Sequence, residues 1–318
     1  MGIEDRSGDV ARAVANGLSG PVKALPPWLL YDEVGSRLFD RITRLEEYTL
    51  TRDERAIFEQ DGDSIVEAAL ALGSGPLSVV ELGAGTATKS EILLRALVRR
   101  QGPTLYEPVD VSATALATAR GRLTRAIPEL TVAERVTTHE EALAALSPGA
   151  GRRLVLFIGS SIGNLDNDEA STLLGGVRAA LGEGGSLLLG TDLVRSPAAL
   201  LPAYDDASGV TAAFNRNLLV RINRELGAHF ETACFRHVVR WNEAASRVEL
   251  YLESVCDQCV PIDAIGLVVE LRAGERIHTE SAVKYDLARV DGLLEAAGLT
   301  RVRTFFGPEQ RFAVHLAR

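Results

Sequence analysis

The pattern of hydrophobic and polar positions changes along the chain. Residues 1–75 place apolar side chains at helical spacing, with one break at Pro26 and Pro27. Beyond them, short apolar runs alternate with helical patterns, and we predict strands at 77–82, 104–111, 152–159 and 185–194. Strands that alternate with helices are typical of a parallel, doubly wound sheet.

After Val194 the rhythm is different. Residues 203–226 have a helical pattern, and the following segments, which alternate with a period of two, predict an antiparallel meander: 236–242, 247–254, 264–274 and 276–286. A helix ended by Gly298 and a closing strand pair return to the first pattern. We therefore predict an α/β protein in which a Rossmann-like sheet carries an inserted α+β domain. The first domain is expected to comprise 59–194 and 286–318, and the second 1–58 and 195–285.

Composition narrows the classes of partner. The chain has 318 residues and a net charge of -9, which disfavours nucleic acid as a ligand. No apolar run is long enough to span a membrane, and the polar N-terminus does not resemble a signal peptide. Three cysteines form no disulfide framework, and Cys256 and Cys259 are only half of a zinc pattern, so we predict no metal. We expect a cytoplasmic monomer that binds a small molecule.

A glycine-rich turn joins the first predicted strand to a helix in VVELGAGTATKS (79–90). Gly83 and Gly85 would let a ligand approach the backbone, but the third glycine of the dinucleotide fingerprint is missing. S-adenosylmethionine has no phosphate and suits this loop better than NAD does. Asp110, at the end of the second strand, is placed to accept hydrogen bonds from ribose hydroxyls. A turn that binds no ligand is the remaining alternative.

Several stretches together resemble the histidine-specific Nα-methyltransferases of ergothioneine biosynthesis and their relatives, some of which act on tryptophan-type amino acids. The resemblance covers nearly the whole chain, and some of its stretches lie outside the generic class I methyltransferase core. The stretches that carry it are PPWLLYDEVGSRLFDRITRLEEYTLTRDE (26–54), VVELGAGTATKS (79–90), FIGSSIGNLDNDEA (157–170), YDDASGVTAAFNRNLLVRINRELGAHF (204–230) and RIHTESAVKYD (276–286).

The resemblance implies a site between the two domains and a role for each matching residue. Tyr31, Tyr48, Asn164 and Tyr204 would surround a free amino acid, with Tyr48 and Asn164 closest to the chemistry. Asn164 could hold the α-amine or carboxylate, and the ring of Tyr48 tolerates a methylammonium. The cofactor would be bound by Glu81, Gly83, Gly85, Thr86, Lys89, Asp110, Gly159 and, where the family has an acidic residue followed by an aromatic one, by His139 and Glu140.

The last motif departs from the family. The family motif has Glu, one residue, then Ser, both bonded to the imidazole of histidine, whereas this chain has Glu280, Ser281 and Ala282. A period of two places Glu280 and Ala282 on one strand face together with His278, and Ser281 on the other. Leu250 would be an apolar wall beside them.

We therefore expect Nα-methylation of L-histidine to its trimethyl betaine. Another heteroaromatic amino acid, such as tryptophan or a derivative, is the first alternative. A protein or RNA methyltransferase, or a module that only binds the cofactor, are further ones.

Overall fold

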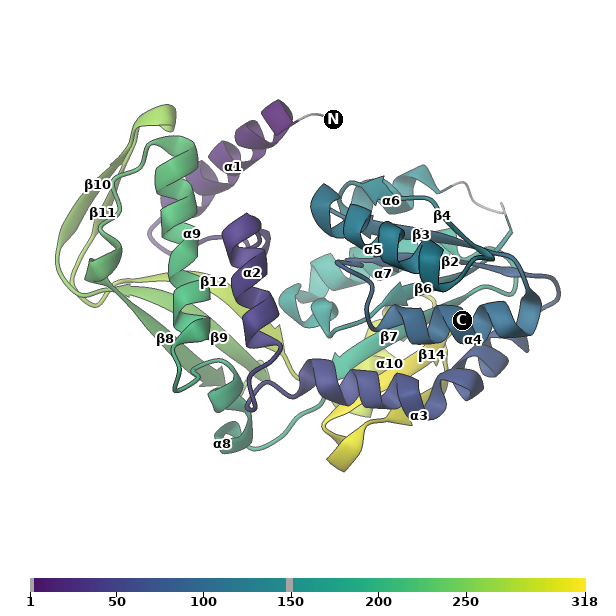
Figure 1. Ribbon diagram of the computed structural model, residues 1–318. Coiled ribbons are helices and arrows are strands. Elements are labelled where there is room, and N and C mark those ends of the chain that lie inside the picture. The colour runs from purple at the N-terminus through teal and green to yellow at the C-terminus, as the bar shows by residue number, and fades with distance from the viewer. Residues whose placement is uncertain (1–2, 147–150) are drawn as a thin grey trace. The chain divides into compact units, whose positions relative to one another are not determined.

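The computed structural model describes residues 3–146 and 151–318, with side chains from residue 8 onward. The chain forms two compact units (Figure 1). Unit 1 contains the residues up to Thr49 and Arg195–Val283, and unit 2 contains Leu50–Val194 and Lys284–Arg318. The first boundary differs from the expected one, because residues 58 and 59 lie inside a continuous helix, α3 (Leu50–Leu70), that belongs to unit 2.

Unit 2 is built on an eight-stranded sheet. Its main order is β13-β14-β7-β6-β2-β3-β4, and β5 also pairs with β3. Strands β2 to β7 pair in parallel, while β14 is antiparallel to both β7 and β13. The strands are β2 (Leu77–Leu82), β3 (Thr104–Asp110), β4 (Leu130–Val132), β5 (Arg135–Val136), β6 (Arg152–Phe157), β7 (Ser186–Asp192), β13 (Arg301–Phe306) and β14 (Phe312–Ala317). This topology confirms the predicted class I methyltransferase sheet.

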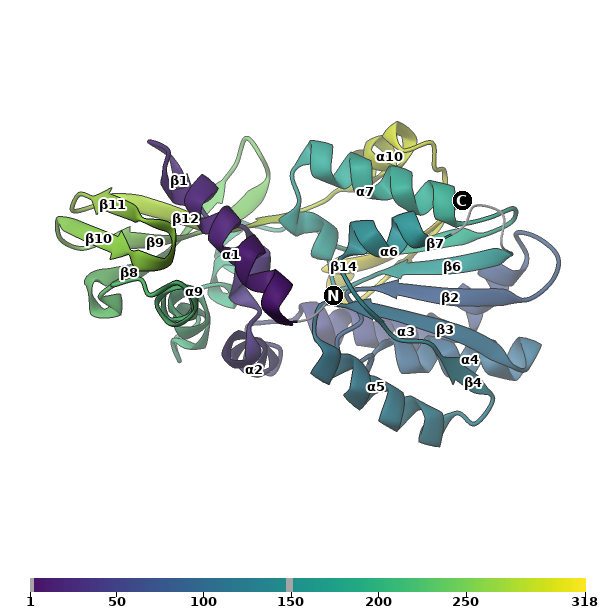
Figure 2. The ribbon, with the colours of Figure 1, turned by 90° about the horizontal axis from the view of Figure 1, so that it is seen from above.

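Helices cover both faces of this sheet. Figure 2 shows α6, α7 and α10 on one side, and α3, α4 and α5 on the other. Because both faces are covered, β6 and β7 are buried along their whole length, which explains the apolar runs LVLF and LLL within them. Besides α3, the helices of this unit are α4 (Ser90–Gln101), α5 (Ala113–Ala126), α6 (His139–Ala145), α7 (Asn167–Ala180) and α10 (Leu287–Ala296).

Side-chain caps fix where several of these helices begin. The side chain of Ser112 accepts a hydrogen bond from the Ala115 N–H at the start of α5. Asp166 and Glu169 form a reciprocal capping box at the start of α7. Both helices follow strands, so the caps also set the point at which the chain leaves the sheet edge.

Unit 1 has a four-stranded sheet in the order β1-β12-β9-β8 and a separate hairpin of β10 and β11. Its strands are β1 (Lys23–Ala24), β8 (Phe235–Asn242), β9 (Arg247–Ser254), β10 (Gln258–Ile262), β11 (Leu267–Leu271) and β12 (Arg276–Val283). Its helices are α1 (Ile3–Leu18), α2 (Glu33–Ile42), α8 (Pro197–Leu200) and α9 (Val210–Leu226). The predicted meander is therefore wrong in one part: β11 leaves it and pairs with β10.

The strand alternation predicted around Glu280 is also wrong at one residue. Strand β12 pairs His278 with Tyr251 and Glu280 with Leu250, so Thr279 is an extra residue in a β-bulge. The bulge puts His278 and Glu280 on opposite faces. His278 lies on the same face as Ser281, whose hydroxyl is 3.0 Å from the His278 Nε2. Glu280 lies on the other face, together with Ala282.

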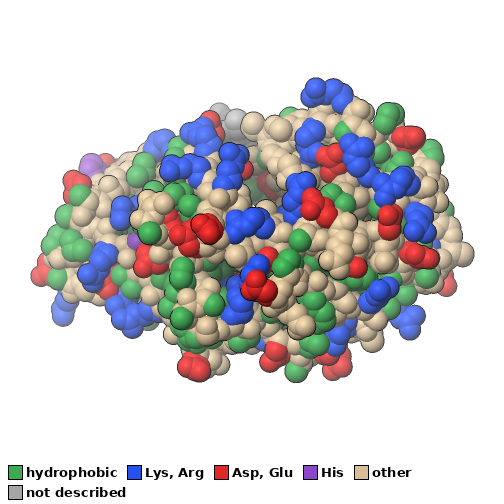
Figure 3. All heavy atoms as spheres, turned by 60° about the horizontal axis from the view of Figure 1, so that its bottom comes forward, with side chains coloured by type: hydrophobic (Ala, Val, Ile, Leu, Met, Phe, Trp, Pro, Cys, Tyr) green, Lys and Arg blue, Asp and Glu red, His purple; other side chains and the backbone are tan. Residues whose placement is uncertain are grey.

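No helix in the described part of the chain is long and apolar enough to cross a membrane. On the face drawn in Figure 3, lysine and arginine side chains are interspersed with aspartate and glutamate.

Candidate active site

The glycine-rich loop is tied to the end of the neighbouring strand β3. The Gly83 N–H donates to the carbonyl of Val109 at 2.9 Å, and the Gly85 N–H donates to the Asp110 Oδ2 at 2.9 Å. Both glycines have positive φ, 70° and 52°, which side chains disfavour. The other Asp110 oxygen accepts from the Ser112 N–H at 2.8 Å. The loop and Asp110 are thus held together at the carboxyl edge of the sheet, where ligands bind in such folds.

His139, at the first turn of α6, lies against the same loop. A Cβ added at Gly83 would meet the His139 Nε2 at 3.4 Å, and the imidazole ring packs edge-on against Phe157 at 5.6 Å. Burial lowers the pKa of His139, so the neutral imidazole is favoured. Glu140, on the same helical turn, is exposed. Thr86, in the glycine-rich loop, is exposed as well.

Glu81 is buried beneath the loop. It accepts a hydrogen bond from the Tyr106 hydroxyl. Desolvation raises the pKa of Glu81 to about 7, although the hydrogen bond from Tyr106 acts in the opposite direction. This carboxyl group, near the end of β2, is thereby bonded to β3 inside the core.

A second buried carboxylate, Glu54 of α3, joins two predicted cofactor residues. Its Oε1 accepts from the Gly159 N–H at 2.7 Å, and its Oε2 pairs with the Lys89 ammonium. The Glu54 side chain is 0% exposed and that of Lys89 is 20% exposed. Sequence analysis missed Glu54, because it lies in an ordinary helical pattern.

The chemistry of these groups fits S-adenosylmethionine. The one lysine in the loop, Lys89, is neutralised by Glu54, so it is not available to balance a pyrophosphate. Asp110, at the end of β3, offers acceptor oxygens that suit ribose hydroxyls, and a cation such as a sulfonium suits a neighbourhood of carboxylates.

Asn164 ends a short 3-10 helix, η2 (Ser161–Asn164), which begins after a three-residue turn that follows β6. The turn before it is fixed by Ser160, which has a left-handed backbone and whose Oγ accepts from the Asp192 N–H at 2.9 Å. The Tyr285 hydroxyl donates to the carbonyl of Ile162 at 3.3 Å. The half-buried Asn164 is therefore presented from a turn at the carboxyl edge of the unit 2 sheet.

In unit 1, two predicted substrate residues join one aromatic cluster. The ring of Tyr31 lies 5.4 Å from Phe39 and 5.4 Å from Phe214 of α9, and Phe39 lies 6.2 Å from Tyr48. The Tyr31 contacts and the Phe39–Tyr48 contact are edge-to-face, the favoured arrangement for such pairs. Helix α2 and helix α9 pack side by side here, which Figure 1 shows.

Three further residues predicted to line the substrate belong to one face of the unit 1 sheet: Leu250, Glu280 and Ala282. Glu280 is paired directly with Leu250, and the buried Ala282 lies on the same face. Register also places His237 of β8 on this face, since it pairs with Leu252. The His237 ring bonds Asn215 of α9 at 2.9 Å and the carbonyl of Tyr204 at 2.9 Å, so α9 and Tyr204 lie over this face.

His237 was not singled out from the sequence. Because its Nε2 faces a carbonyl oxygen, that nitrogen carries the proton and Nδ1 accepts from the Asn215 amide. Burial lowers the pKa of His237, which favours this neutral ring. Its position in an alternating strand gave no signal that distinguished it from other strand residues.

Among the residues that the structure describes, no group of three or more His, Cys, Asp or Glu side chains could hold a metal ion. Cys259 is exposed, and Cys234 and Cys256 are half-buried.

Comparison with known proteins agrees with the fold and the motifs. Residues 10–318 match the family described as histidine-specific methyltransferase, SAM-dependent. The histidine N-alpha-methyltransferase of Mycobacterium tuberculosis is 41% identical over 306 residues, covering 96% of this chain and 94% of that protein. The protein of the same name from Mycolicibacterium smegmatis is also 41% identical, with the same coverage. Ergothioneine biosynthesis protein 1 of Neurospora crassa is 31% identical over 93% of this chain and 33% of its own length. This chain therefore belongs to the family of histidine-specific, S-adenosylmethionine-dependent methyltransferases.

Proposed function

We propose that this enzyme transfers methyl groups to the α-amine of free L-histidine and that repeated transfer produces the trimethyl betaine. The observation that carries the proposal is the 41% identity over 96% of the chain to histidine N-alpha-methyltransferases. The placement of Glu280 supports it, because a carboxylate beside the apolar Leu250 suits a heteroaromatic ring with an N–H.

Each residue has a stated part in this proposal. S-adenosylmethionine, when bound, supplies an electrophilic methyl group on sulfur. The residues proposed to hold this cofactor are Glu81, Gly83, Gly85, Thr86, Lys89, Asp110, His139, Glu140 and Gly159. Tyr31, Tyr48, Asn164 and Tyr204 are proposed to hold the amino acid, with Leu250, Glu280 and Ala282 around its side chain.

The chemistry requires a neutral amine whose lone pair points at the methyl carbon. The N–C bond forms as the C–S bond breaks, and the electron pair of that bond remains on sulfur. The ammonium must first lose a proton to water or a nearby oxygen. Asn164 and Tyr48 act by alignment and by contact with the growing positive charge, and alignment is the larger part of catalysis in such transfers.

The serine of the family motif is replaced by Ala282, and this favours a second candidate, Nα-methylation of tryptophan or a derivative. Without a hydroxyl beside Glu280, the side-chain pocket has one fewer polar group that would need a partner. A larger ring with a single N–H could then satisfy Glu280 alone.

Incubation with labelled S-adenosylmethionine and a panel of free amino acids, read by mass spectrometry, tests the proposal. Histidine should gain label, with products one, two and three methyl groups heavier. Label in tryptophan without label in histidine would establish the second candidate. No label in any free amino acid would refute both.

A further inference from the structure

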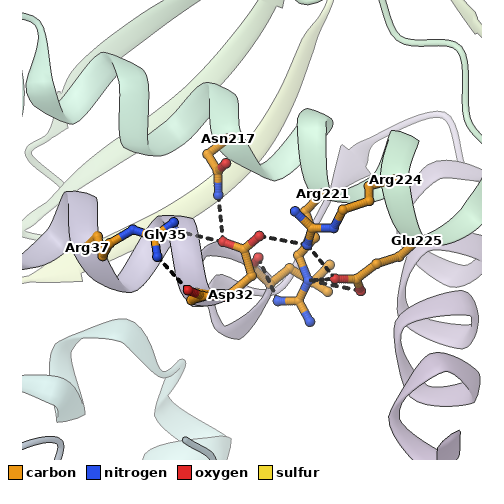
Figure 4. Close-up of polar contacts among 9 residues, drawn as sticks. Asp32, Gly35, Arg37, Asn217, Arg221, Arg224 and Glu225 are labelled. Carbon is orange, nitrogen blue, oxygen red and sulfur yellow. Dashed lines mark hydrogen bonds and ion pairs between the residues drawn. The ribbon is translucent and has the colours of Figure 1, made fainter. Parts of the chain in front are cut away.

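The carboxylate of Asp32 connects the beginning of α2 with two residues of α9. Its Oδ1 accepts from the Gly35 N–H at 2.7 Å and from the Asn217 Nδ2 at 2.8 Å. Its Oδ2 accepts from an Arg224 guanidinium nitrogen at 2.8 Å. Figure 4 shows these donors converging on the one carboxylate. All of them lie in unit 1.

The charge of Asp32 is maintained although its side chain is only 6% exposed. Burial alone would raise the pKa of this carboxyl group, but the hydrogen bonds from Gly35, Arg224 and Asn217 outweigh burial and lower it. An ordinary helix cap needs only the bond to Gly35. The two bonds to α9 exceed what capping requires.

A second contact fixes the segment just before Asp32. Arg221, one turn earlier on α9 than Arg224, donates to the carbonyl of Leu29 at 2.9 Å, and its guanidinium lies 5.8 Å from the Trp28 ring centroid. Helix α9 therefore holds the chain on both sides of Tyr31. The turn itself is tight, since a Cβ at Gly35 would lie 1.7 Å from the Leu30 carbonyl oxygen.

These contacts with α9 fix the position of Tyr31. Its ring packs edge-on against Phe214, which lies on the same helix as Asn217 and Arg224. Phe39, on the helix that Asp32 caps, contacts Tyr31 from a second direction and also contacts Tyr48. A shift of α2 along α9 would displace both tyrosines together.

We propose that Asp32 is a positioning residue for the amino-acid substrate, which fixes α2 to α9 so that Tyr31 and Tyr48 are in place before the substrate binds. The inference rests on the proposed function, in which these tyrosines hold the amino acid. Asp32 itself is not a catalytic residue, because it acts through the residues beside it. Preorganisation of this kind reduces the loss of freedom on binding.

Two variants separate the cap from the connection to α9. Asp32→Asn keeps an oxygen for Gly35, and Asn is as good a helix cap as Asp, but its amide would present a donor to Arg224. Asp32→Ala removes every bond. Asp40→Ala is the matched control, because Asp40 lies on the same helix and its carboxylate pairs only with the exposed Arg44 among the described ion pairs.

Three quantities are measured. The first is KM together with kcat, and the second is the Kd of S-adenosylhomocysteine alone. The third is the Kd of the amino acid that the wild-type enzyme methylates, determined in the presence of S-adenosylhomocysteine. We expect the amino-acid Kd and KM to rise about threefold for Asp32→Asn and about tenfold or more for Asp32→Ala. Affinity for S-adenosylhomocysteine should stay within about twofold, because its proposed ligands lie in unit 2. Asp40→Ala should match the wild type.

A purely structural role would give a different result. Asp32→Ala or Asp32→Asn would then melt earlier but bind the amino acid with wild-type affinity when folded, and the proposal would be overturned. If Asp32→Ala does not fold, Asp32→Asn decides alone, since it retains the cap. Failure of the proposed function would be seen separately, as a wild-type enzyme that methylates no free amino acid.

Discussion

Replacement of Glu54 by glutamine tests whether a buried carboxylate supports the cofactor site. Glu54 is fully buried, accepts from the Gly159 N–H and pairs with Lys89. The glutamine amide has one oxygen, so it can serve Gly159 or Lys89 but not both, and its NH₂ group then faces another donor. The change keeps the side-chain volume, so its effect reports the polar contacts and not a cavity.

The structure sets the size of the effect. Removal of one partner from a buried ion pair costs about 3–5 kcal/mol. Lys89 is 20% exposed, so water recovers part of this loss, and we expect about 2–3 kcal/mol of local destabilisation. Released from Glu54, Lys89 and Gly159 no longer hold a fixed geometry. Affinity for S-adenosylmethionine, which carries a positive sulfonium, should fall about tenfold.

The assays must report on unit 2. Both tryptophans, Trp28 and Trp241, lie in unit 1, so their fluorescence is not a direct probe of this region. Hydrogen exchange of the Gly159 amide is the direct measure, and it should become about 30- to 150-fold faster, the equivalent of the expected loss. Calorimetry gives the cofactor affinity. Glu59→Gln is the control, since Glu59 lies on the same helix in an exposed pair with Arg55.

Unchanged exchange at Gly159 together with unchanged cofactor affinity would refute this reasoning. Faster exchange with normal affinity would show that Glu54 stabilises the sheet edge without shaping the cofactor site. In that case the assignment of Lys89 and Gly159 as cofactor ligands would lose its support.

Three further changes test other parts of the molecule. Burial lowers the pKa of His315 to about 4, against about 6.5 in an unfolded chain. Between pH 6.5 and pH 4 this histidine is therefore protonated in the unfolded chain but not in the folded one. Acidification across this range should remove up to about 3 kcal/mol of the free energy of unfolding. His315→Gln should flatten that part of a plot of stability against pH, and an unchanged slope would contradict the assignment. Asn164→Ala should reduce kcat/KM at least ~100-fold, and near-normal turnover would remove this residue from the site. Ala282→Ser should lower the KM for histidine about threefold to tenfold if its hydroxyl bonds the imidazole, and should leave the KM for tryptophan no better.

Much of unit 2 was predictable because local patterns and topology agree there. The run at 77–82 became a strand with the same bounds, since a parallel sheet covered on both faces requires continuous apolar segments. In unit 1, period two identified strands but not their partners. Gln258–Ile262 contains Pro261, which argues against a central strand, yet Pro261 is tolerated in a two-stranded hairpin that has only edges.

Contacts between distant segments could not be predicted from the sequence. Glu54 and Glu59 both lie in the same amphipathic helix, five residues apart, and the sequence does not distinguish them. Only the packing of α3 against the rest of unit 2 makes Glu54 buried and leaves Glu59 exposed. Asp32 could be recognised as a cap from its position before a helix, but its bonds to Asn217 and Arg224 join residues that are 185 and 192 positions apart in the sequence. Such pairs need the fold before they can be seen.

The bulge at Thr279 shows how one residue changes the interpretation of a motif. The Thr279 hydroxyl donates to the Leu250 carbonyl at 3.1 Å, which stabilises the irregular pairing, and no feature of the sequence HTES signals it. The bulge leaves Glu280 and Ala282 on one face but commits the hydroxyl of Ser281 to His278 on the other. Ser281 therefore cannot substitute for the missing serine of the family motif.

If Glu280 recognises the side chain of the substrate, as we propose, it does so beside Leu250 without a hydroxyl from either of the next two residues. The choice between imidazole and indole then depends on pocket shape more than on a second polar contact.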